Sequence, residues 1–250
     1  MDRSAPLLSL RSLSKHFGGV RALVDVDLDV HRGEVVALVG DNAAGKSTVA
    51  RIVAGVYAPD AGTLHLNGER LALTSPAAAF PHGIATVFQE FALAENLDVV
   101  DNIFLGRELR TRGLLDRPRM EELARSYLRQ LNARIPDLGV PLHQLSAGQR
   151  QCVAIARTLV RQPQLVVLDE PTASLSVSQT AEVLSYIEGL RDLGLGVILI
   201  SHNLNDVRAV ADRIAVLRHG RNNGTFDTAT ASYEDILSAV TGATRHEKHD

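Results

Sequence analysis

Nine consecutive residues between two apolar segments have the composition of a phosphate-binding loop. They are Gly40, Asp41, Asn42, Ala43, Ala44, Gly45, Lys46, Ser47 and Thr48. Small residues let the backbone turn so that several N–H groups point at one anion, and the start of the following helix adds partial positive charge. Lys46 can then reach the outer phosphates of a nucleotide, and the Ser47 hydroxyl can bind Mg²⁺. A glycine-rich turn that binds nothing is disfavoured, because both the spacing and the flanking segments fit.

Two adjacent carboxylates, Asp169 and Glu170, directly follow the apolar run Leu165–Leu168. Ligands of open α/β sheets bind at the carboxyl ends of the strands. A first carboxylate there can hold Mg²⁺, usually through water, and the next can polarise an attacking water. Alone, such a pair indicates only surface groups at a strand end. The phosphate-binding loop upstream favours the chemical interpretation.

Two further positions are candidates for contact with phosphate. Ser146, with Gln149 three residues later, has the spacing of a capping box, which predicts a helix N-terminus that could also receive an anion. Because one loop already serves one nucleotide, this second anion site makes sense if it completes the site of another copy. His202 follows the apolar run Val197–Ile200, where a histidine is either a turn residue or a catalytic one.

Three apolar runs must position these groups, and their composition is typical of central strands of a parallel sheet. These runs are Val35–Val39, Leu165–Leu168 and Val197–Ile200. An early antiparallel lobe is predicted from Leu7–Leu13, Val24–Val30, and Gly62–Gly68 with Glu69–Leu73. Residues Lys15–Gly19 are expected to form a turn that presents Phe17, although a core aromatic is equally compatible with the pattern. Ile84–Gln89 is predicted to be another strand.

The middle of the chain changes to helical periodicity. From about Phe91 to Leu159 apolar residues recur at helical spacing, beginning at Leu93, which predicts a helical lobe inserted into the sheet. Within it the charged segment Arg107–Arg119 is expected to be a solvated loop. Later helices and a closing hairpin are expected at Thr180–Leu193, Leu204–Ala211, Arg213–Phe226 with its turn at Gly220–Gly224, and Tyr233–Val240.

Composition narrows the classes of protein that the chain can belong to. The 250 residues carry a net charge of −3 with 22% charged residues, so no basic nucleic-acid footprint is present. No apolar run approaches the ~20 residues that span a bilayer, and the first residues lack a signal-peptide pattern, so a cytoplasmic protein is expected. The single cysteine, Cys152, is expected to be a small buried residue rather than a reactive thiol.

The order of these motifs resembles the ATP-binding cassette (ABC) ATPase family from about Leu7 to Gly242. The resemblance implies an α/β P-loop NTPase fold with a mostly parallel central sheet, an N-terminal antiparallel β lobe and an inserted helical lobe. It implies one cassette domain over 1–242, with a nucleotide-binding core at 7–90 and 160–230, a helical lobe at about 91–159 and a polar tail at 243–250. It also implies ATP and Mg²⁺ as ligands.

The resemblance assigns roles to individual residues. Phe17 falls where the family stacks an aromatic on adenine, Gly40–Thr48 on the Walker A loop, and Leu165–Asp169 on Walker B. Glu170 corresponds to the catalytic base and His202 to the switch histidine, with Lys46 as a further catalytic group. Ser47, Gln89 and Asp169 correspond to groups around Mg²⁺. Ser146, Ala147, Gly148 and Gln149 match the signature motif that closes on a partner's γ-phosphate, and Ala173–Ser176 falls on the loop at the dimer interface.

Three positions depart from the family pattern. Ala43 and Ala147 stand where glycine is usual, and Ser176 where aspartate is usual. A methyl group is tolerated only if the local φ is negative, and at a positive φ the phosphate contacts could shift and slow turnover. The loss of the aspartate removes one polar contact across a dimer, although serine can still form a hydrogen bond.

Further segments resemble ATPases of bacterial carbohydrate importers of the ribose, xylose and fructose type. They include Phe88–Glu90, Asn102–Glu108 and Glu170–Leu175. This resemblance implies a homodimer on the inner face of the membrane, bound to transmembrane permease subunits and through them to a solute-binding protein. The alternatives are a cassette that remodels nucleic acid or ribosomes, a phosphotransferase, and a cassette that binds ATP without turnover.

Overall fold

The computed structural model describes residues 5–88 and 93–243. Its central sheet has the strand order β12-β11-β3-β10-β9-β6, and all neighbours in it are parallel except the β11–β12 pair. The strands are β3 (Val35–Val39), β6 (Ile84–Val87), β9 (Leu165–Asp169), β10 (Gly196–Ile200), β11 (Arg213–Arg218) and β12 (Arg221–Asp227). Every residue of β3, β9 and β10 is buried, as their uninterrupted apolar composition predicts.

A second, wholly antiparallel sheet lies beside the first, with the order β2-β1-β4-β5. Its strands are β1 (Leu8–Phe17), β2 (Val20–Val30), β4 (Ala61–Leu66) and β5 (Glu69–Leu71). The expected turn at Lys15–Gly19 is too long, because Phe17 still pairs with Val20 and only the two glycines between them turn. The Asn67–Gly68 turn is confirmed, with φ of 51° and 80°, the left-handed pair that a tight hairpin requires.

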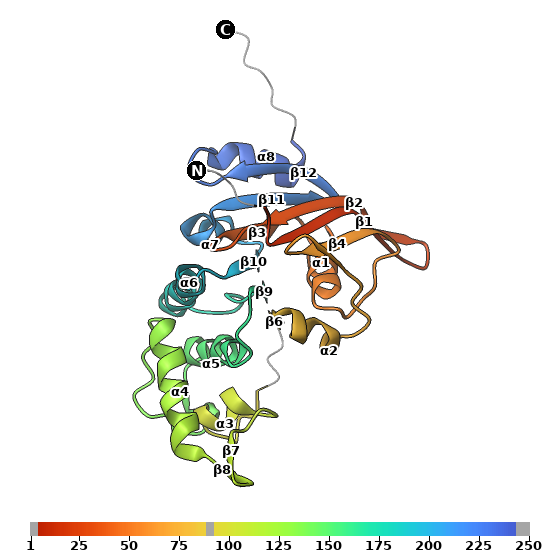
Figure 1. The fold of residues 1–250 in the computed structure, drawn as a ribbon. Helices are drawn as coiled ribbons and strands as arrows, with labels where there is room; N and C mark the ends of the chain where they lie inside the picture. The colour runs from red at the N-terminus through yellow and green to blue at the C-terminus, as the bar shows by residue number, and fades with distance from the viewer. Residues whose placement is uncertain (1–4, 89–92, 244–250) are drawn as a thin grey trace.

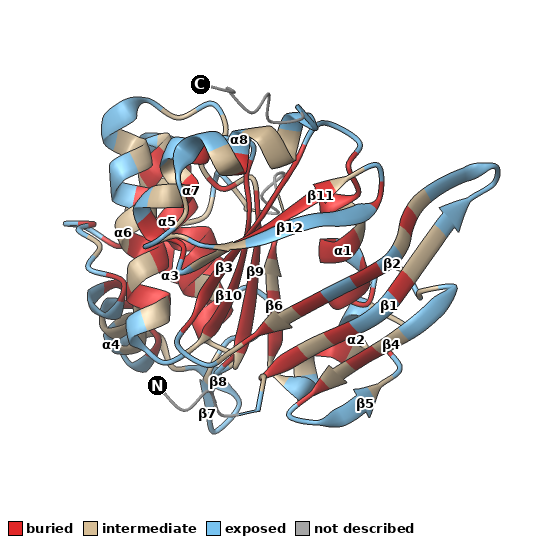
Figure 2. Ribbon diagram, turned by 90° about the horizontal axis from the view of Figure 1, so that it is seen from above, coloured by how far each residue is buried: buried red, intermediate tan, exposed pale blue. Residues whose placement is uncertain are grey.

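Helices cover both faces of the central sheet (Figures 1 and 2). One face packs on α1 (Lys46–Val53) and the antiparallel sheet, and the other on α5 (Ala147–Leu159), α6 (Val177–Asp192) and α7 (Leu204–Val210). Alternate residues of β3 enter the two cores: Val36 and Leu38 one, Val35 and Ala37 the other. The remaining short helices are α2 (Pro76–Ala79), the 3₁₀ turns η1 (Phe80–His82) and η2 (Leu142–Gln144), and α8 (Tyr233–Thr241).

The segment between β6 and α5 contains α3 (Val99–Phe104), a small hairpin of β7 (Arg110–Thr111) and β8 (Leu114–Leu115), and α4 (Arg117–Gln130). The segment Arg107–Arg119 is mostly exposed, as predicted, but it is not simply a loop, because it contains this hairpin and the start of α4. Helical structure also starts later than Leu93, because the Asp98 side chain caps α3 by accepting a hydrogen bond from the Asp101 N–H. Cys152 is fully buried, as expected.

Two later boundaries also differ from expectation. The β11–β12 turn is His219–Gly220 rather than Gly220–Gly224, because Arg218 pairs directly with Arg221. Helix α6 begins at Val177, three residues before the predicted start, because Ser176 caps it. Among the described residues no helix has both the length and the apolar composition needed to span a bilayer.

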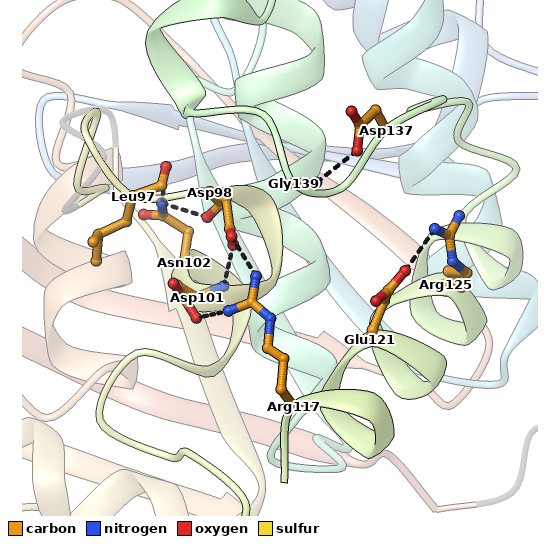
Figure 3. Close-up of polar contacts among 9 residues, drawn as sticks. All are labelled: Leu97, Asp98, Asp101, Asn102, Arg117, Glu121, Arg125, Asp137 and Gly139. Atoms are coloured by element: carbon orange, nitrogen blue, oxygen red, sulfur yellow. Dashed lines mark hydrogen bonds and ion pairs between the residues drawn. The ribbon is translucent and has the colours of Figure 1, made fainter. Parts of the chain in front are cut away.

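Asn102 anchors the chain that enters the helical segment (Figure 3). This fully buried side chain accepts a hydrogen bond from the Ala94 N–H and donates to the carbonyls of Ala94, Leu97 and Asp98. An Asn102→Leu variant leaves the partly buried Ala94 N–H without its acceptor, whereas the three carbonyls keep other backbone N–H donors, so we expect the free energy of unfolding to fall by about 1–3 kcal/mol. Urea denaturation measures the loss. Asn96→Leu, at an exposed position, is the matched control and should change little.

Candidate functional site

The loop Gly40–Thr48 connects β3 to α1, and its glycines are required by close backbone approach. Gly40 has a φ of 150°, and a Cβ atom there would lie 2.1 Å from the Leu217 carbonyl oxygen. Gly45 has a φ of 103°, and its Cβ would lie 2.6 Å from Leu23 Cδ2 and 2.7 Å from the Ala22 oxygen. The loop is thus pressed between the ends of β11 and β2, and any side chain at either position would displace it.

Lys46 is held inside this loop. Its side-chain ammonium donates to the carbonyl oxygens of Gly40 and Asp41 at 2.7 and 2.9 Å, and the residue is 7% exposed. Burial lowers its pKa, while the nearby Glu170 and Asp169 carboxylates oppose that change. Helix α1 starts here with no side-chain cap, and the first N–H groups of a helix have no partner within it. The loop therefore combines a buried cation with backbone donors, which is the chemistry of a phosphate site.

Asp169 and Glu170 lie at the carboxyl end of β9, beside the loop. Asp169 is 6% exposed and accepts a hydrogen bond from the Ser47 hydroxyl at 3.3 Å. Burial raises the pKa of the Asp169 carboxyl, and the Ser47 hydrogen bond opposes the rise. Glu170 has a left-handed φ of 52°, and its N–H donates to the Ile200 carbonyl at 3.0 Å. The end of β9 is thereby joined to the end of β10.

His202 follows β10 and meets Glu170 across the two strand ends. His202 Nδ1 lies 2.8 Å from Glu170 Oε2, with the histidine side chain 65% exposed and the glutamate 16% exposed. An exposed imidazole on a largely buried carboxylate can both orient that carboxylate and contact a ligand from solvent. The structure thus brings together the ends of β3, β9 and β10, with Lys46, Asp169, Glu170 and His202 at one edge of the sheet.

The donor set fits Mg²⁺. This ion prefers hard oxygen ligands and usually takes one or two carboxylates, with its other positions filled by phosphate oxygens and water. Ser47 and Asp169 present a hydroxyl and a buried carboxylate within 3.3 Å of each other. Within residues 5–88 and 93–243, no group of three or more His, Cys, Asp and Glu side chains is placed to hold a metal. Gln89, the third predicted neighbour of Mg²⁺, lies outside the described residues.

Phe17 is exposed, not a core residue. It ends β1 with 43% of its surface exposed, and its ring packs edge-on against Tyr57 with centroids 5.1 Å apart. Its hairpin partner β2 supplies Ala22 and Leu23, the residues that would meet a Cβ at Gly45. The hairpin that carries the aromatic ring therefore abuts the loop.

Ser146–Gln149 form the predicted capping box at the start of α5. The Gln149 N–H donates to Ser146 Oγ at 3.2 Å, and the Ser146 N–H donates to Gln149 Oε1 at 3.0 Å. Gly148 faces α6, because a Cβ there would lie 3.1 Å from Glu182 Oε2. Helix α5 packs on α3, α4, α6 and β6, whereas α1 packs on β9 and β2. The N-terminus of α5 and the N-terminus of α1 therefore lie in different parts of the fold. None of the packing contacts named for either helix brings these two ends together.

The three departures from the family pattern have different structural consequences. Ala43 has a φ of 65°, so the condition for tolerating its methyl group is not met. Ala147 lies in the first turn of α5 outside the left-handed region and carries no such strain. Ser176 forms a second capping box with Gln179 at the start of α6, a role visible in the serine–glutamine spacing but not predicted.

Two supporting residues were not predicted either. The Thr172 hydroxyl donates to the Asp206 carboxylate at 2.8 Å, tying the segment after Glu170 to α7. Asn203, next to His202, caps α7 by accepting from the N–H groups of Asn205 and Asp206. The cap has a local signal in an asparagine that precedes a helical segment. The Thr172–Asp206 hydrogen bond joins residues 34 positions apart, so no local sequence signal predicts it.

Known proteins resemble the chain over nearly its whole length. The profile of a family described as ABC transporter matches residues 23–173. A ribose import ATP-binding protein of Burkholderia ambifaria is 42% identical over 237 residues, which cover 94% of this chain but 47% of that protein. The chain thus spans about half of that relative. A xylose/arabinose import ATP-binding protein of Sulfolobus acidocaldarius is 43% identical over 235 residues, 94% of each chain.

A solved structure shares the fold. It is a dimeric, post-hydrolysis ATP-binding cassette bound to ADP and phosphate, with a TM-score of 0.73 and 25% identity. The alignment covers 88% of this chain and 98% of that one. The α/β architecture expected from the sequence is confirmed by this similarity.

Glycine at two alanine positions should have opposite effects on stability. Ala43→Gly removes the left-handed strain, so we expect the free energy of unfolding to rise by about 1 kcal/mol. Ala147→Gly loosens a helix start that has no such strain, so we expect a fall of up to about 1 kcal/mol. Urea denaturation of the two variants beside the wild type measures both changes. Equal effects at the two positions would contradict the conformational argument.

The buried Asp169 carboxylate should reduce stability at neutral pH. Because its pKa is higher in the folded protein than in the unfolded chain, the ionised form is disfavoured by folding. Asp169→Asn keeps the shape without the charge, so we expect a higher thermal unfolding midpoint at neutral pH. The advantage should shrink as the pH falls through the folded-state pKa, where the wild-type carboxyl is protonated. Thermal unfolding of both proteins across a neutral-to-acidic series tests this, and an advantage that grows on acidification would contradict it.

Proposed function

The chain belongs to the ABC transporter family, and from that premise we propose that it is the ATP-hydrolysing subunit of a membrane importer for a sugar. The observation that carries the proposal is the 2.8 Å contact between His202 Nδ1 and Glu170 Oε2 beside the phosphate-binding loop. This contact joins Glu170, which can accept a proton from water, to His202, which can contact a phosphate group. The names of two relatives, import ATP-binding proteins for ribose and for xylose or arabinose, support a sugar as the transported solute.

In this proposal the loop Gly40–Thr48 holds the phosphates of ATP. Lys46 exchanges its two carbonyl partners for phosphate oxygens, a change favoured because a hydrogen bond between two charged groups is the stronger kind. Phe17 stacks on the adenine ring from the end of β1. Ser47 and Asp169, together with Gln89, would hold Mg²⁺, which would offset the negative charge of the phosphates.

Glu170 acts as the general base for hydrolysis. Its carboxylate accepts a proton from water as the water attacks the γ-phosphate, and the contact with His202 fixes the orientation of that carboxylate. His202 and Lys46 then stabilise the negative charge on the transferred phosphoryl group. The hydrogen bond from the Glu170 N–H to Ile200 keeps the base at the strand end.

Two copies of the chain complete each site. The helix end at Ser146, Ala147, Gly148 and Gln149 carries backbone donors, but α5 and α1 pack against different elements. A second copy arranged head to tail would bring its α5 end to the phosphate held by the first loop. The dimer then closes on ATP and reopens after hydrolysis, because the γ-phosphate contacts exist only in the closed form.

We propose further that the chain forms one cassette domain and works with membrane partners. Residues 7–90 and 160–230 form the nucleotide-binding core of a single cassette domain over 1–242, with a helical lobe at about 91–159. Transmembrane permease subunits dock on the inner face of the membrane, at the segment of the chain that contains Gln89. The described residues on either side of that segment, Phe88 and Leu93, line a pocket of about 240 Å³. A solute-binding protein delivers the sugar to those permeases.

A second candidate is a cassette that binds ATP with little turnover. The left-handed Ala43 favours it, because strain in the loop could shift the phosphate contacts. Steady-state phosphate release, from the free subunit and from the assembled transporter, distinguishes the two candidates. Rapid release identifies the hydrolytic enzyme, and binding without release identifies the second candidate.

Glu170→Gln should trap ATP. The amide cannot accept the proton of the attacking water, so we expect turnover to fall by roughly 10²–10⁴ while ATP binding is retained. The trapped nucleotide should hold the variant as a dimer, measured by light scattering during gel filtration with ATP and Mg²⁺.

A matched double variant separates dimer closure from nucleotide binding. Ser146→Arg in the Glu170→Gln background places a bulky cation at the α5 end, which should abolish the dimer but leave ATP bound to the monomer. Near-normal turnover in Glu170→Gln would refute the assigned base. A dimer that survives Ser146→Arg would refute the assigned interface.

A further inference from the structure

The β7–β8 hairpin presents two adjacent leucines to solvent. Leu114 is 76% exposed and Leu115 is 59% exposed, and Leu105 at the end of α3 is 37% exposed. A single exposed leucine is ordinary, but Leu114 and Leu115 are adjacent and directly follow the turn of an ordered hairpin. Figure 1 shows the hairpin at the end of the molecule farthest from α8, and Figure 2 colours it exposed.

The hairpin is held in shape at both ends. Its turn, Arg112–Gly113, has φ of 54° and 85°, which matches the tight two-residue hairpin turn. The Thr111 hydroxyl donates to the Asp116 carboxylate at 2.7 Å, and the Asp116 N–H donates to the Leu109 carbonyl at 2.8 Å. The exposed leucines therefore belong to a fixed projection.

The base of the hairpin is clamped to α3 (Figure 3). Arg117, the first residue of α4, bridges the carboxylates of Asp98 and Asp101 at the start of α3. Its charge is thereby neutralised within the fold. Arg117 thus fixes the direction of the projection and does not contribute to its surface charge.

The surface of the hairpin is basic. Four other arginines between positions 105 and 119 are exposed, and within the described part of the chain no ion pair joins any of them to a carboxylate: Arg107, Arg110, Arg112 and Arg119. The segment 105–119 holds five arginines and two acidic residues, so it stays basic although Glu108 lies close enough to Arg110, and Asp116 to Arg119, for electrostatic attraction. This cluster stands out in a chain whose net charge is −3.

The strand geometry sets how the leucines can be used. Leu114 lies opposite Thr111 and Leu115 opposite Arg110, so successive side chains point to opposite faces of the hairpin. Both leucines reach a common surface only if the hairpin approaches it tip first. Arg112, in the turn itself, and Arg110, opposite Leu115, then flank the leucines, and their long side chains can reach back to lipid phosphates.

We propose that this basic hairpin, residues 105–119, contacts the surface of an anionic lipid bilayer. The tip leucines enter the boundary between headgroups and acyl chains, and the four exposed arginines bind lipid phosphates. A bilayer suits so small an element because it demands no shape complementarity, whereas a stable protein interface buries upwards of about 1,000 Å². The contact needs neither ATP nor a partner chain, so it is separate from the proposed hydrolysis.

A tryptophan at the tip reports the contact directly, because the chain contains no tryptophan. The full-length Leu114→Trp variant is mixed with vesicles of phosphatidylglycerol and phosphatidylcholine, or of phosphatidylcholine alone. We expect a blue shift in emission, and quenching by brominated acyl chains, only with the anionic vesicles. Val20→Trp, at a residue 67% exposed on the β1–β2 hairpin, is the matched control and should not respond.

Charge variants test the electrostatic part. In the Leu114→Trp background, Arg110→Gln with Arg112→Gln should weaken binding to anionic vesicles roughly 10- to 30-fold, and raised salt should do the same. Circular dichroism checks that the fold is unchanged. No response to anionic vesicles, or equal binding of the charge variant, overturns the proposal. A response that appears only when permease subunits are present in the vesicles also overturns it, and assigns the hairpin to a protein contact.

Discussion

The hydrogen-bond register of three parallel strands is the constraint on which the rest of the structure depends. In β10, Ile200 is opposite Leu38 of β3 and Asp169 of β9, so the three strands end at one level. Residues that follow these strands are then neighbours whatever their separation in the chain. Glu170 and His202 meet because of this register, although 32 residues separate them. The buried apolar side chains on both faces hold the register, because a slip by one residue would exchange the two faces.

The site concentrates backbone strain that this framework has to support. Ala43, Glu170 and Ser174 all have left-handed φ angles, of 65°, 52° and 63°. Each costs on the order of 1–2 kcal/mol for a residue with a side chain. Glu170 is held in place by its hydrogen bond to Ile200 and by the Thr172–Asp206 pair that follows it. The strain at Glu170 is therefore supported by contacts to β10 and α7, elements that do not contribute the loop Gly40–Thr48.

The sequence predicted best those elements whose signal is local and strong. The strands β3, β9 and β10 were predicted from the runs Val35–Val39, Leu165–Leu168 and Val197–Ile200, because burial on both faces requires an uninterrupted apolar run. The Ser146 capping box was also predicted, because its signal is the local spacing of Ser146 and Gln149. The β7–β8 hairpin was missed because its strands have two residues each and its turn uses arginine and glycine rather than asparagine and glycine. Periodicity cannot be detected in so short a strand.

Contacts between distant residues were accessible only as far as topology could be inferred. A parallel sheet predicted that Asp169, Glu170 and His202 share one edge, but not that Nδ1 of the histidine faces the glutamate. The φ of Ala43 was likewise open, since an alanine in place of a glycine does not reveal whether the loop relaxes or keeps the strained angle. On either side of Ala43 the loop passes close to other elements, because a Cβ at Gly40 would meet Leu217 and one at Gly45 would meet Leu23.

The charged groups at the strand ends and those of the basic hairpin differ in how far they are buried. At the strand ends, charged groups are partly buried and engaged with one another, so Lys46 binds its own loop and Glu170 binds His202. Each such contact is worth only about 1–3 kcal/mol net, which a charged phosphate can replace. At the basic hairpin the arginines are exposed, and burial imposes no partner on them. Nucleotide binding at the strand ends and lipid contact at the hairpin, as proposed, would therefore use separate groups, so neither would disturb the other.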